Sequence, residues 1–203
     1  MPTEWINQEH LKEAQALNKK YLSAQPYPHL QLNDFLAPKK FAQLIEALSQ
    51  LAFEHKENDL FSLAQTPALQ SVEDETIQSF IQFMNSKELR EWFSTVTGEE
   101  TTPGALDIFG AIYQDTDYLL AHDDQLEDRK IAWILYLTTL TPEEGGALAL
   151  FSDEQGLPKQ KIVSYQPIAN SLAFFTVSSK SWHEVEEVTA DTSRVSVGGW
   201  LKC

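Results

Sequence analysis

The hydrophobic period changes once along this chain of 203 residues, at the turn-forming segment Thr-Thr-Pro-Gly of residues 101–104. Before this segment, apolar residues recur at spacings of three and four, which is typical of amphipathic helices. After it, short β-branched and aromatic runs alternate with turn-forming clusters, which is typical of strands. We therefore expect helices in the first half of the chain and an antiparallel sheet in the second.

The first half predicts four helices and one short strand. In the second of these helices, Phe41, Leu44, Ile45 and Leu48 form the expected apolar face. The predicted helices cover residues 4–23, a segment that begins at Pro38, residues 72–84, and a segment between Ser86 as N-cap and Gly98 just past the end; the strand covers residues 29–36.

The second half predicts eight short strands with no helix-length segment between them. They cover residues 106–114, 118–121, 131–139, 147–151, 161–165, 171–177, 182–188 and 194–201. Eight antiparallel strands are typical of a jelly roll, and helices gathered at one end of the chain are expected to cover one outer face. We therefore predict an α+β fold, a double-stranded β-helix (jelly roll) with N-terminal helices packed on one face. It forms a single domain of residues 1–203, with helical support to about residue 100.

The charge balance restricts the partners. Fifteen Lys and Arg against 30 Asp and Glu give a net charge of −15 at pH 7. This surplus repels phosphate backbones and anionic lipid, so we expect neither nucleic acid nor membrane as a direct partner. It favours a basic partner, or serves only to keep the chain soluble. The polar N-terminal stretch has no apolar signal core and the one cysteine, Cys203, can close no internal disulfide, so the expected location is cytoplasmic.

Two histidines and an aspartate are the candidate metal ligands. His122 and Asp124 stand two residues apart at the end of a predicted strand, so both are expected on one face while Asp123 points away. His183 lies in another predicted strand, which a closed double sheet can bring opposite. Two imidazoles and one carboxylate leave three adjacent positions open on an octahedral ion, which suits non-heme Fe(II) oxygen chemistry. A surface His–Asp pair without a metal is the alternative.

An arginine begins the last predicted strand, eleven residues after His183. Arg194 and Ser196 share one strand face, and an arginine on the interior face is unfavourable unless it pairs with a carboxylate. That strand offers no acidic residue, so a small dicarboxylate is a candidate partner. The alternative is an edge-strand arginine that points to solvent.

These features together resemble the Fe(II)/2-oxoglutarate-dependent prolyl hydroxylases, and more closely the catalytic domain of the ribosomal prolyl 3-hydroxylase family. The resemblance covers about residues 27–200. It rests on Tyr27-Pro28-His29, Asn33-Asp34-Phe35-Leu36, His55-Lys56-Glu57-Asn58-Asp59-Leu60, Leu120-Ala121-His122-Asp123-Asp124, residues 129–137, Gly145-Gly146-Ala147-Leu148 and Phe174-Phe175-Thr176-Val177-Ser178, together with His183, Arg194 and Ser196.

The resemblance implies an enzyme that uses Fe(II), 2-oxoglutarate and O₂, with ascorbate as reductant and with succinate and CO₂ as coproducts. Its implied substrate is a proline in a small-subunit ribosomal protein, which is a basic partner. The implied metal ligands are His122, Asp124 and His183, and the implied cosubstrate-binding residues are Arg194, Ser196, Tyr113 and Tyr136. Judged from the residues alone, either tyrosine can equally be an amphipathic core residue.

Other interpretations stay open at this stage. An oxygenase of this kind can act on free proline or another small molecule. A zinc hydrolase can use the same three ligands, and a jelly-roll binding module needs no metal at all. Glu184, Glu186 and Glu187 near His183 can guide a basic substrate or can simply form a solvated strand face. No oligomeric state is predicted.

Overall fold

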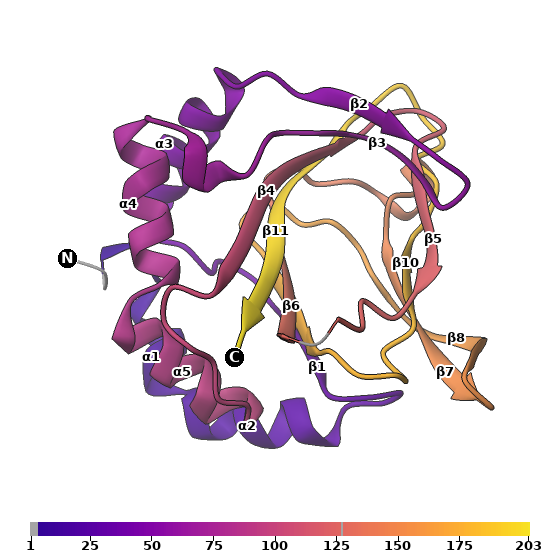
Figure 1. The fold of residues 1–203 in the computed structure, drawn as a ribbon, viewed down its shortest axis with the longest axis horizontal. Helices are drawn as coiled ribbons and strands as arrows, with labels where there is room; N and C mark the ends of the chain where they lie inside the picture. Colours follow the sequence, from indigo (N-terminus) through magenta and orange to yellow (C-terminus); the bar gives the residue numbers. More distant parts are fainter. Residues whose placement is uncertain (1–3, 127) are drawn as a thin grey trace.

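The computed structural model describes residues 4–126 and 128–203, which fold into a layer of helices packed on a curled antiparallel sheet (Figure 1). In this described part, eleven strands form one sheet in the order β1-β9-β6-β11-β4-β3-β5-β10-β7-β8, and β2 pairs with β3. The strands are β1 (His29–Leu32), β2 (Glu54–Glu57), β3 (Phe61–Gln65), β4 (Leu106–Tyr113), β5 (Tyr118–His122), β6 (Arg129–Tyr136), β7 (Leu148–Glu154), β8 (Leu157–Tyr165), β9 (Leu172–Thr176), β10 (His183–Val185) and β11 (Arg194–Lys202). Residues 1–3 of the predicted domain lie outside the described residues.

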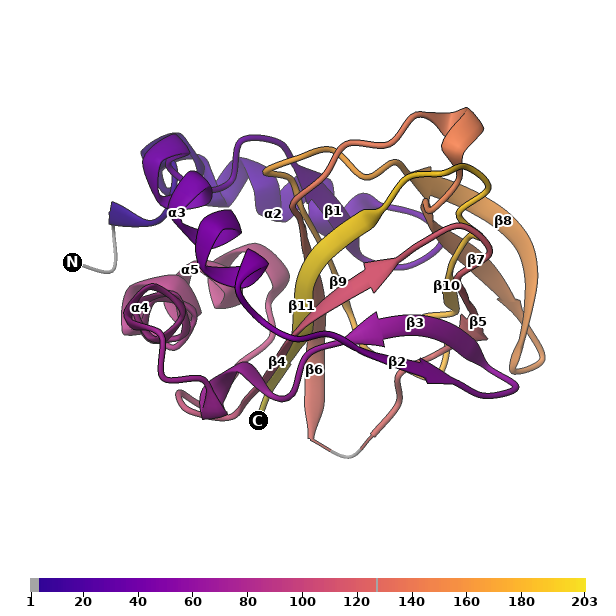
Figure 2. The same ribbon diagram turned by 90° about the horizontal axis from the view of Figure 1, so that it is seen from above.

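The helices gather on one side of the molecule, and β5, β7, β8 and β10 lie on the other (Figures 1 and 2). The α-helices are α1 (Gln8–Lys12), α2 (Ala14–Ser23), α3 (Pro38–Ser49), α4 (Glu75–Met84) and α5 (Lys87–Thr97), and the short 3₁₀ helices are η2 (Leu69–Ser71) and η3 (Pro142–Glu144). Among the described residues, no helix has the length and apolar character that crossing a bilayer requires.

Alternation along β6 separates two apolar layers. Ile131, Trp133 and Leu135 are buried in the large core between the sheet and the helices, whereas Ala132 and Tyr136 belong to a second cluster on the inner side of the sheet. Successive side chains of a strand point to opposite faces, so one strand serves both layers. The predicted fold class, an α+β jelly roll with N-terminal helices on one face, is confirmed.

The helix predictions are confirmed with different bounds. The first helix is interrupted at Glu13, although Leu17 and Tyr21 keep the predicted buried face. The helix predicted at 72–84 begins at residue 75, because the Asp74 side chain accepts a hydrogen bond from the backbone N–H of Ile77 and caps the helix there. Ile45 is 37% exposed, so its predicted place on the apolar face of α3 is wrong.

All eight strands predicted after residue 104 are present, with ends that differ by a few residues. The strand predicted at 29–36 ends at Leu32, because residues 33 and 34 turn, with Asp34 at a left-handed φ of 51°. The hairpin of β2 and β3 was not predicted. Every residue of β2 is exposed, so it carries no apolar alternation for a sequence pattern to detect.

Candidate active site

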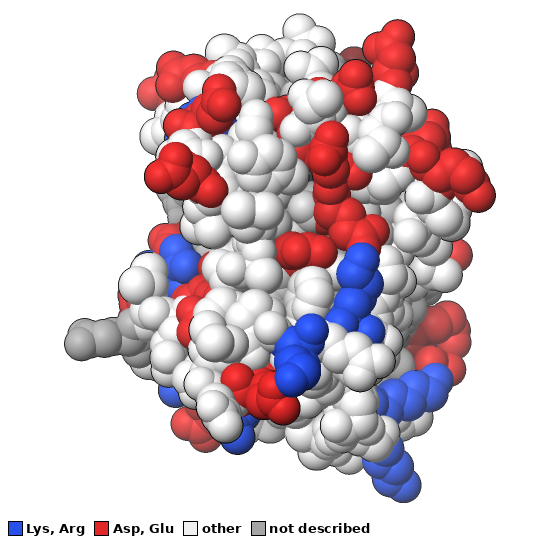
Figure 3. Space-filling model, turned by 90° about the vertical axis from the view of Figure 1, so that its right-hand side faces the viewer, with Lys and Arg blue, Asp and Glu red and all other residues white. Residues whose placement is uncertain are grey.

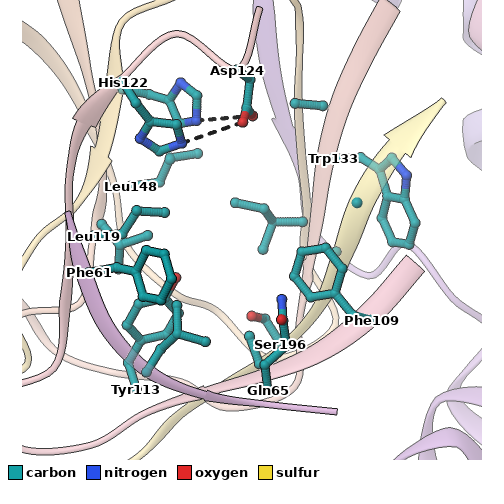
Figure 4. Close-up of a pocket in the computed structure, with 18 of the residues that line it drawn as sticks. Phe61, Gln65, Phe109, Tyr113, Leu119, His122, Asp124, Trp133, Leu148 and Ser196 are labelled. Carbon is teal, nitrogen blue, oxygen red and sulfur yellow. Dashed lines mark ion pairs between the residues drawn. The ribbon is translucent and has the colours of Figure 1, made fainter. Parts of the chain in front are cut away.

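Two neighbouring strands bring the predicted metal ligands together. His122 ends β5, His183 begins β10, and the two residues face each other in the antiparallel pair of these strands. Their ring centroids are 4.1 Å apart. The Nε2 atoms of His122 and His183 lie 3.5 Å and 3.4 Å from Oδ1 and Oδ2 of Asp124, respectively, as Figure 4 shows. One candidate ligand atom from each of the three residues lies within 4.8 Å of the others, so the cluster can hold one metal ion.

Asp124 reaches this cluster by a different route from the predicted one. The prediction placed it on β5 two residues after His122, but β5 ends at His122 and Asp124 lies beyond it with φ 61°. Aspartate tolerates this left-handed conformation better than most residues. Asp123 stays outside the cluster, as predicted, and its carboxylate accepts a hydrogen bond from the backbone N–H of Gln125.

The outer nitrogens of both histidines are fixed by backbone carbonyls. Nδ1 of His122 lies 2.8 Å from the carbonyl oxygen of Leu120, and Nδ1 of His183 lies 2.8 Å from that of Ser181. A carbonyl oxygen only accepts, so each Nδ1 carries a proton, and each Nε2 is the ring nitrogen that faces Asp124. A metal would take Nε2 as its ligand atom, with the hydrogen bond at Nδ1 fixing the ring.

The protonation states of the cluster follow from burial and from mutual contact. Burial opposes ionisation of Asp124, but the hydrogen bonds of His122 and His183 outweigh it and hold the pKa of this carboxyl far below its usual range. Burial, with the neighbouring His122, lowers the pKa of His183. Burial also acts to lower the pKa of His122, but the Asp124 carboxylate outweighs this effect and raises it. An ionised aspartate and a neutral His183 are therefore ready for a cation.

A buried arginine lies deeper in the fold. Arg194 is 1% exposed, and its guanidinium carbon lies 4.8 Å from the ring centroid of Tyr113 and 5.0 Å from that of Tyr136. Its Nη1 donates to the Ser196 hydroxyl at 3.4 Å. Among the described residues, Nε and Nη2 of Arg194 and the Tyr136 hydroxyl have no hydrogen-bond partner. A buried cation with free donors fits an anionic ligand, as the sequence predicted.

One cavity of about 320 Å³ connects the histidine cluster with Arg194. Tyr113 and Ser196 lie across this cavity from His122 and Asp124 (Figure 4). Tyr113 lines the cavity, whereas Tyr136 is not among the lining residues, although it contacts the Arg194 guanidinium. Most of the remaining lining is apolar, and it consists of Leu60, Phe61, Leu63, Phe109, Ala111, Leu119, Ala132, Trp133, Ile134, Leu148, Phe175, Val185 and Trp200, with the glycines of β11 and Gln65.

Two residues beside Asp124 were not predicted as part of the site. The indole N–H of Trp200 donates to Oδ2 of Asp124 at 2.8 Å, and Nη1 of Arg129 lies 3.2 Å from Oδ1. A usable signal was present, because Trp200 follows Arg194 by six residues and shares its strand face. For Arg129, the spacing of residues in the sequence gave no comparable indication that its side chain contacts Asp124.

The residues present fit both groups that the predicted chemistry requires. Two imidazole nitrogens and a carboxylate suit non-heme Fe(II), and the free donors of Arg194 suit a carboxylate. A jelly roll with these two features at opposite ends of one cavity defines the class of 2-oxoglutarate-dependent iron oxygenases. Residues 108–202 match a domain family described as "2OG-Fe(II) oxygenase superfamily", and the matched part contains His122, Asp124, His183 and Arg194.

Curated relatives extend the similarity beyond this domain. The chain is 38% identical over 184 residues to "Prolyl 3-hydroxylase OGFOD1" of Mus musculus, covering 89% of this chain and 33% of that protein. It is 35% identical over 194 residues to "Prolyl 3,4-dihydroxylase OGFOD1" of Ostreococcus tauri, covering 87% and 38%. To "Prolyl 3-hydroxylase sudestada1" of Drosophila melanogaster it is 34% identical over 173 residues, covering 79% and 31%. The chain thus spans about a third of the length of these relatives.

Solved structures share the fold. A prolyl-4-hydroxylase from Pseudomonas putida matches with a TM-score of 0.71 at 18% identity, covering 93% of this chain and 98% of that one. A prolyl hydroxylase from Trichoplax adhaerens, in complex with a hypoxia inducible factor peptide fragment, matches with a TM-score of 0.70 at 17% identity, covering 96% and 91%. At these identities the match establishes the fold.

Proposed function

We propose that this protein is an Fe(II)- and 2-oxoglutarate-dependent dioxygenase that hydroxylates a prolyl residue in a small-subunit ribosomal protein. The observation that carries the proposal is the placement of His122, Asp124 and His183 across one cavity from the buried Arg194. The similarity to prolyl 3-hydroxylases of mouse and fly supports proline as the substrate residue. The basic substrate rests on the charge of the chain and on the family resemblance.

In this proposal each end of the cavity has one task. The iron ligands are His122, Asp124 and His183, and the residues around the cosubstrate are Arg194, Ser196, Tyr113 and Tyr136. Arg194 binds the distal carboxylate of 2-oxoglutarate through the donors that have no partner among the described residues. The Tyr136 hydroxyl also has no hydrogen-bond partner among the described residues, and it can donate a hydrogen bond to that carboxylate.

When bound, iron and 2-oxoglutarate supply the oxidation: O₂ and 2-oxoglutarate give succinate and CO₂, and one oxygen atom enters a substrate C–H bond. The side chains of the cavity bind and orient the cosubstrate and the substrate, and they exclude water. Phe175 and Leu148 line the cavity beside the histidines and keep water from that end.

The lining of the cavity supports a prolyl ring within a polypeptide over free proline. Leu60, Phe61 and Phe109 are apolar, and they suit an uncharged five-membered ring. Free proline would bring an ammonium and a carboxylate into the same apolar surroundings, which is unfavourable without partners.

The surface charge supports a basic partner. Figure 3 shows acidic side chains spread over the face on the side of β5, β7, β8 and β10, with a smaller basic group among them. A shallow hollow on this face is lined by Glu184, Glu186 and Glu187, of which Glu186 pairs with Lys161. Ribosomal proteins are basic because they contact RNA, and the cytoplasmic location expected from the sequence would bring them within reach.

The test combines purified protein with Fe(II), ascorbate, 2-oxoglutarate and O₂, and offers either a proline-containing small-subunit ribosomal protein or free proline. We expect the ribosomal protein to gain the mass of one oxygen atom on a proline, with an equal amount of succinate. Hydroxylation of free proline alone would overturn the substrate and leave the oxygenase chemistry standing. A complete lack of 2-oxoglutarate-dependent succinate in air would overturn both, and would favour a zinc hydrolase or a binding module.

A further inference from the structure

Asp124 is held on the side that faces away from the histidines. Its Oδ2 accepts the indole N–H of Trp200 at 2.8 Å, and its Oδ1 lies 3.2 Å from Nη1 of Arg129. Each carboxylate oxygen therefore has one contact toward a histidine and one contact away from it. The hydrogen-bond donors of Trp200 and Arg129 fix the χ2 torsion of Asp124. Without such partners this torsion has a broad distribution.

Arg129 and Trp200 also hold each other. The guanidinium carbon of Arg129 lies 3.3 Å from the centroid of the Trp200 ring, which is a stacked cation–π contact. The two residues come from β6 and β11, which are paired along their length. The Arg129 side chain is 15% exposed and that of Asp124 is 8% exposed, so the contacts are shielded from water.

The backbone around Asp124 makes these contacts necessary. Asp124 lies past the end of β5 in a left-handed conformation, so no strand pairing restrains it. The orientation of its carboxylate depends on its side-chain partners instead.

We propose that Arg129 and Trp200 act as a pair of positioning residues that fix the Asp124 carboxylate for metal binding. The pair fixes the direction of both oxygens, and the Arg129 cation balances the buried carboxylate before the metal arrives. This inference rests on the proposed function, because it takes Asp124 as a metal ligand. Partners of this kind behind a ligand typically change metal affinity by about 10- to 100-fold when they are removed.

The test uses Trp200→Phe, which keeps an aromatic ring for Arg129 to stack on and removes the N–H donor, and Arg129→Lys, which keeps the charge and removes the planar fork. The Co(II) dissociation constant is measured by calorimetry, and the visible spectrum of the Co(II) protein reports the coordination of the metal. We expect each variant to bind Co(II) at least about tenfold more weakly than the unchanged protein, with a shifted spectrum.

Trp92→Phe is the control. Trp92 is buried in the core on the helix side, does not line the cavity, and donates its indole N–H to the carbonyl oxygen of His10 at 2.8 Å. We expect this variant to keep the Co(II) affinity and spectrum of the unchanged protein, so the general effect of losing an indole hydrogen bond is separated from the loss of the hydrogen bond to Asp124.

The outcomes are distinct. Unchanged Co(II) affinity and spectrum in a folded Trp200→Phe protein overturn the inference, as does an equal loss of affinity in Trp92→Phe. If Trp200→Phe fails to fold, the Arg129→Lys protein decides by the same criteria. If the unchanged protein itself binds no Co(II), the metal site of the proposed function fails, and the inference fails with it.

Discussion

Arg194 is the residue whose surroundings set the cosubstrate requirement. Its guanidinium lies between two tyrosine rings and reaches Ser196, in a position that a carboxylate can complete. A lysine at this position keeps the charge but offers a point donor in place of a planar fork.

We therefore expect Arg194→Lys to keep its metal affinity and to bind 2-oxoglutarate about 10- to 100-fold more weakly, which corresponds to roughly 1.5–3 kcal/mol for a charge-assisted hydrogen-bonded pair. The measurement is a 2-oxoglutarate titration of the Mn(II) protein without O₂. An unchanged dissociation constant would place Arg194 outside the cosubstrate site.

His29 gives the fold a dependence on pH. It is 5% exposed, and its two ring nitrogens contact the Tyr165 hydroxyl at 2.6 Å and the Gln25 carbonyl at 2.9 Å. The Gln25 carbonyl oxygen accepts a hydrogen bond from the Nε2–H group. Nδ1 then accepts a hydrogen bond from the Tyr165 hydroxyl, and the ring is neutral. Burial lowers the pKa of His29, and the hydrogen bond to Gln25 offsets this only in part.

The native state therefore binds this proton less readily than the unfolded chain, whose histidines titrate near pH 6.5. The stability that comes from neutral His29 is complete above about pH 6.5 and is lost as the pH falls below it, at up to roughly 1.4 kcal/mol per pH unit. We expect urea unfolding between pH 7.5 and 5.0 to show a smaller loss of stability in His29→Gln than in the unchanged protein. Equal losses in the two proteins would show that His29 does not titrate on unfolding.

Single residues were predictable where their chemistry is rare. Two histidines with an aspartate, followed by an interior Arg-x-Ser, stand out in any chain, and the structure brings these residues to one cavity. The reason given for Asp124 was wrong, because strand alternation does not extend past His122. The Arg129–Trp200 contact was not predictable, because it depends on the pairing of β6 with β11, which no local pattern encodes.

At the scale of elements, β11 connects the helical layer to the site. It pairs with β4 on one side and with β6 on the other, and it carries Arg194, Ser196 and Trp200 on its inner face. Gly199 lets β4 approach closely, because a Cβ atom there would lie 1.9 Å from the carbonyl oxygen of Asp107. Backbone atoms in a paired strand cannot move aside as a flexible side chain can.

We expect Gly199→Ala to separate β11 from β4, to lower the free energy of unfolding by about 1–3 kcal/mol or more, and to weaken Co(II) binding because Trp200 moves. Urea denaturation and calorimetry measure the two effects. Gly156→Ala is the control for metal binding: a Cβ atom at this position in the turn between β7 and β8 meets nothing within 4 Å, so the alanine only strains the local backbone at φ 79° and Co(II) affinity is expected to stay the same. Native stability and metal affinity in Gly199→Ala would contradict this role of the glycine.

Strands with one buried face were predictable from the sequence, and exposed strands were not. The strands of the jelly roll have one face in an apolar layer, so their alternation is visible in the sequence. The β2–β3 hairpin contributes Phe61 and Gln65 to the cavity, yet β2 is exposed throughout. The local signal for this hairpin was Asn58, whose side chain accepts hydrogen bonds from the backbone N–H groups of Leu60 and Phe61 in the turn.

At the scale of the whole molecule, one large core joins the helices to the sheet. Residues of α2, α3, α4 and α5 are buried together with residues of β4, β6, β9 and β11. This continuity supports our proposal that the helical layer and the jelly roll fold as one domain.

Net charge also acts at this scale. With a net charge of −15, and with Glu184 and Glu187 in the hollow beside β5 and β10, the protein is expected to attract a basic substrate at a distance. We predict that the apparent affinity for a basic ribosomal protein falls several-fold as salt rises, since exposed charges more than ~10 Å apart are screened at 0.1 M. The double variant Glu184→Gln, Glu187→Gln should reduce this salt dependence.

The control for charge is Glu46→Gln, Glu75→Gln, which removes two exposed acids from α3 and α4 on the helical side. It changes the net charge by the same amount but leaves the face over β10 intact. If both double variants behave alike, net charge alone attracts the substrate and the face over β10 has no special role.

The most direct test of the account is 2-oxoglutarate-dependent succinate formation with Fe(II), O₂ and substrate, compared between Asp124→Ala and Asp123→Ala. These neighbours differ by one residue in sequence, but only the Asp124 carboxylate faces the two histidines. We expect Asp124→Ala to lose iron and to form no succinate while it stays folded, and Asp123→Ala to form succinate at close to the rate of the unchanged protein. Full succinate formation by Asp124→Ala, or a loss confined to Asp123→Ala, would contradict this expectation.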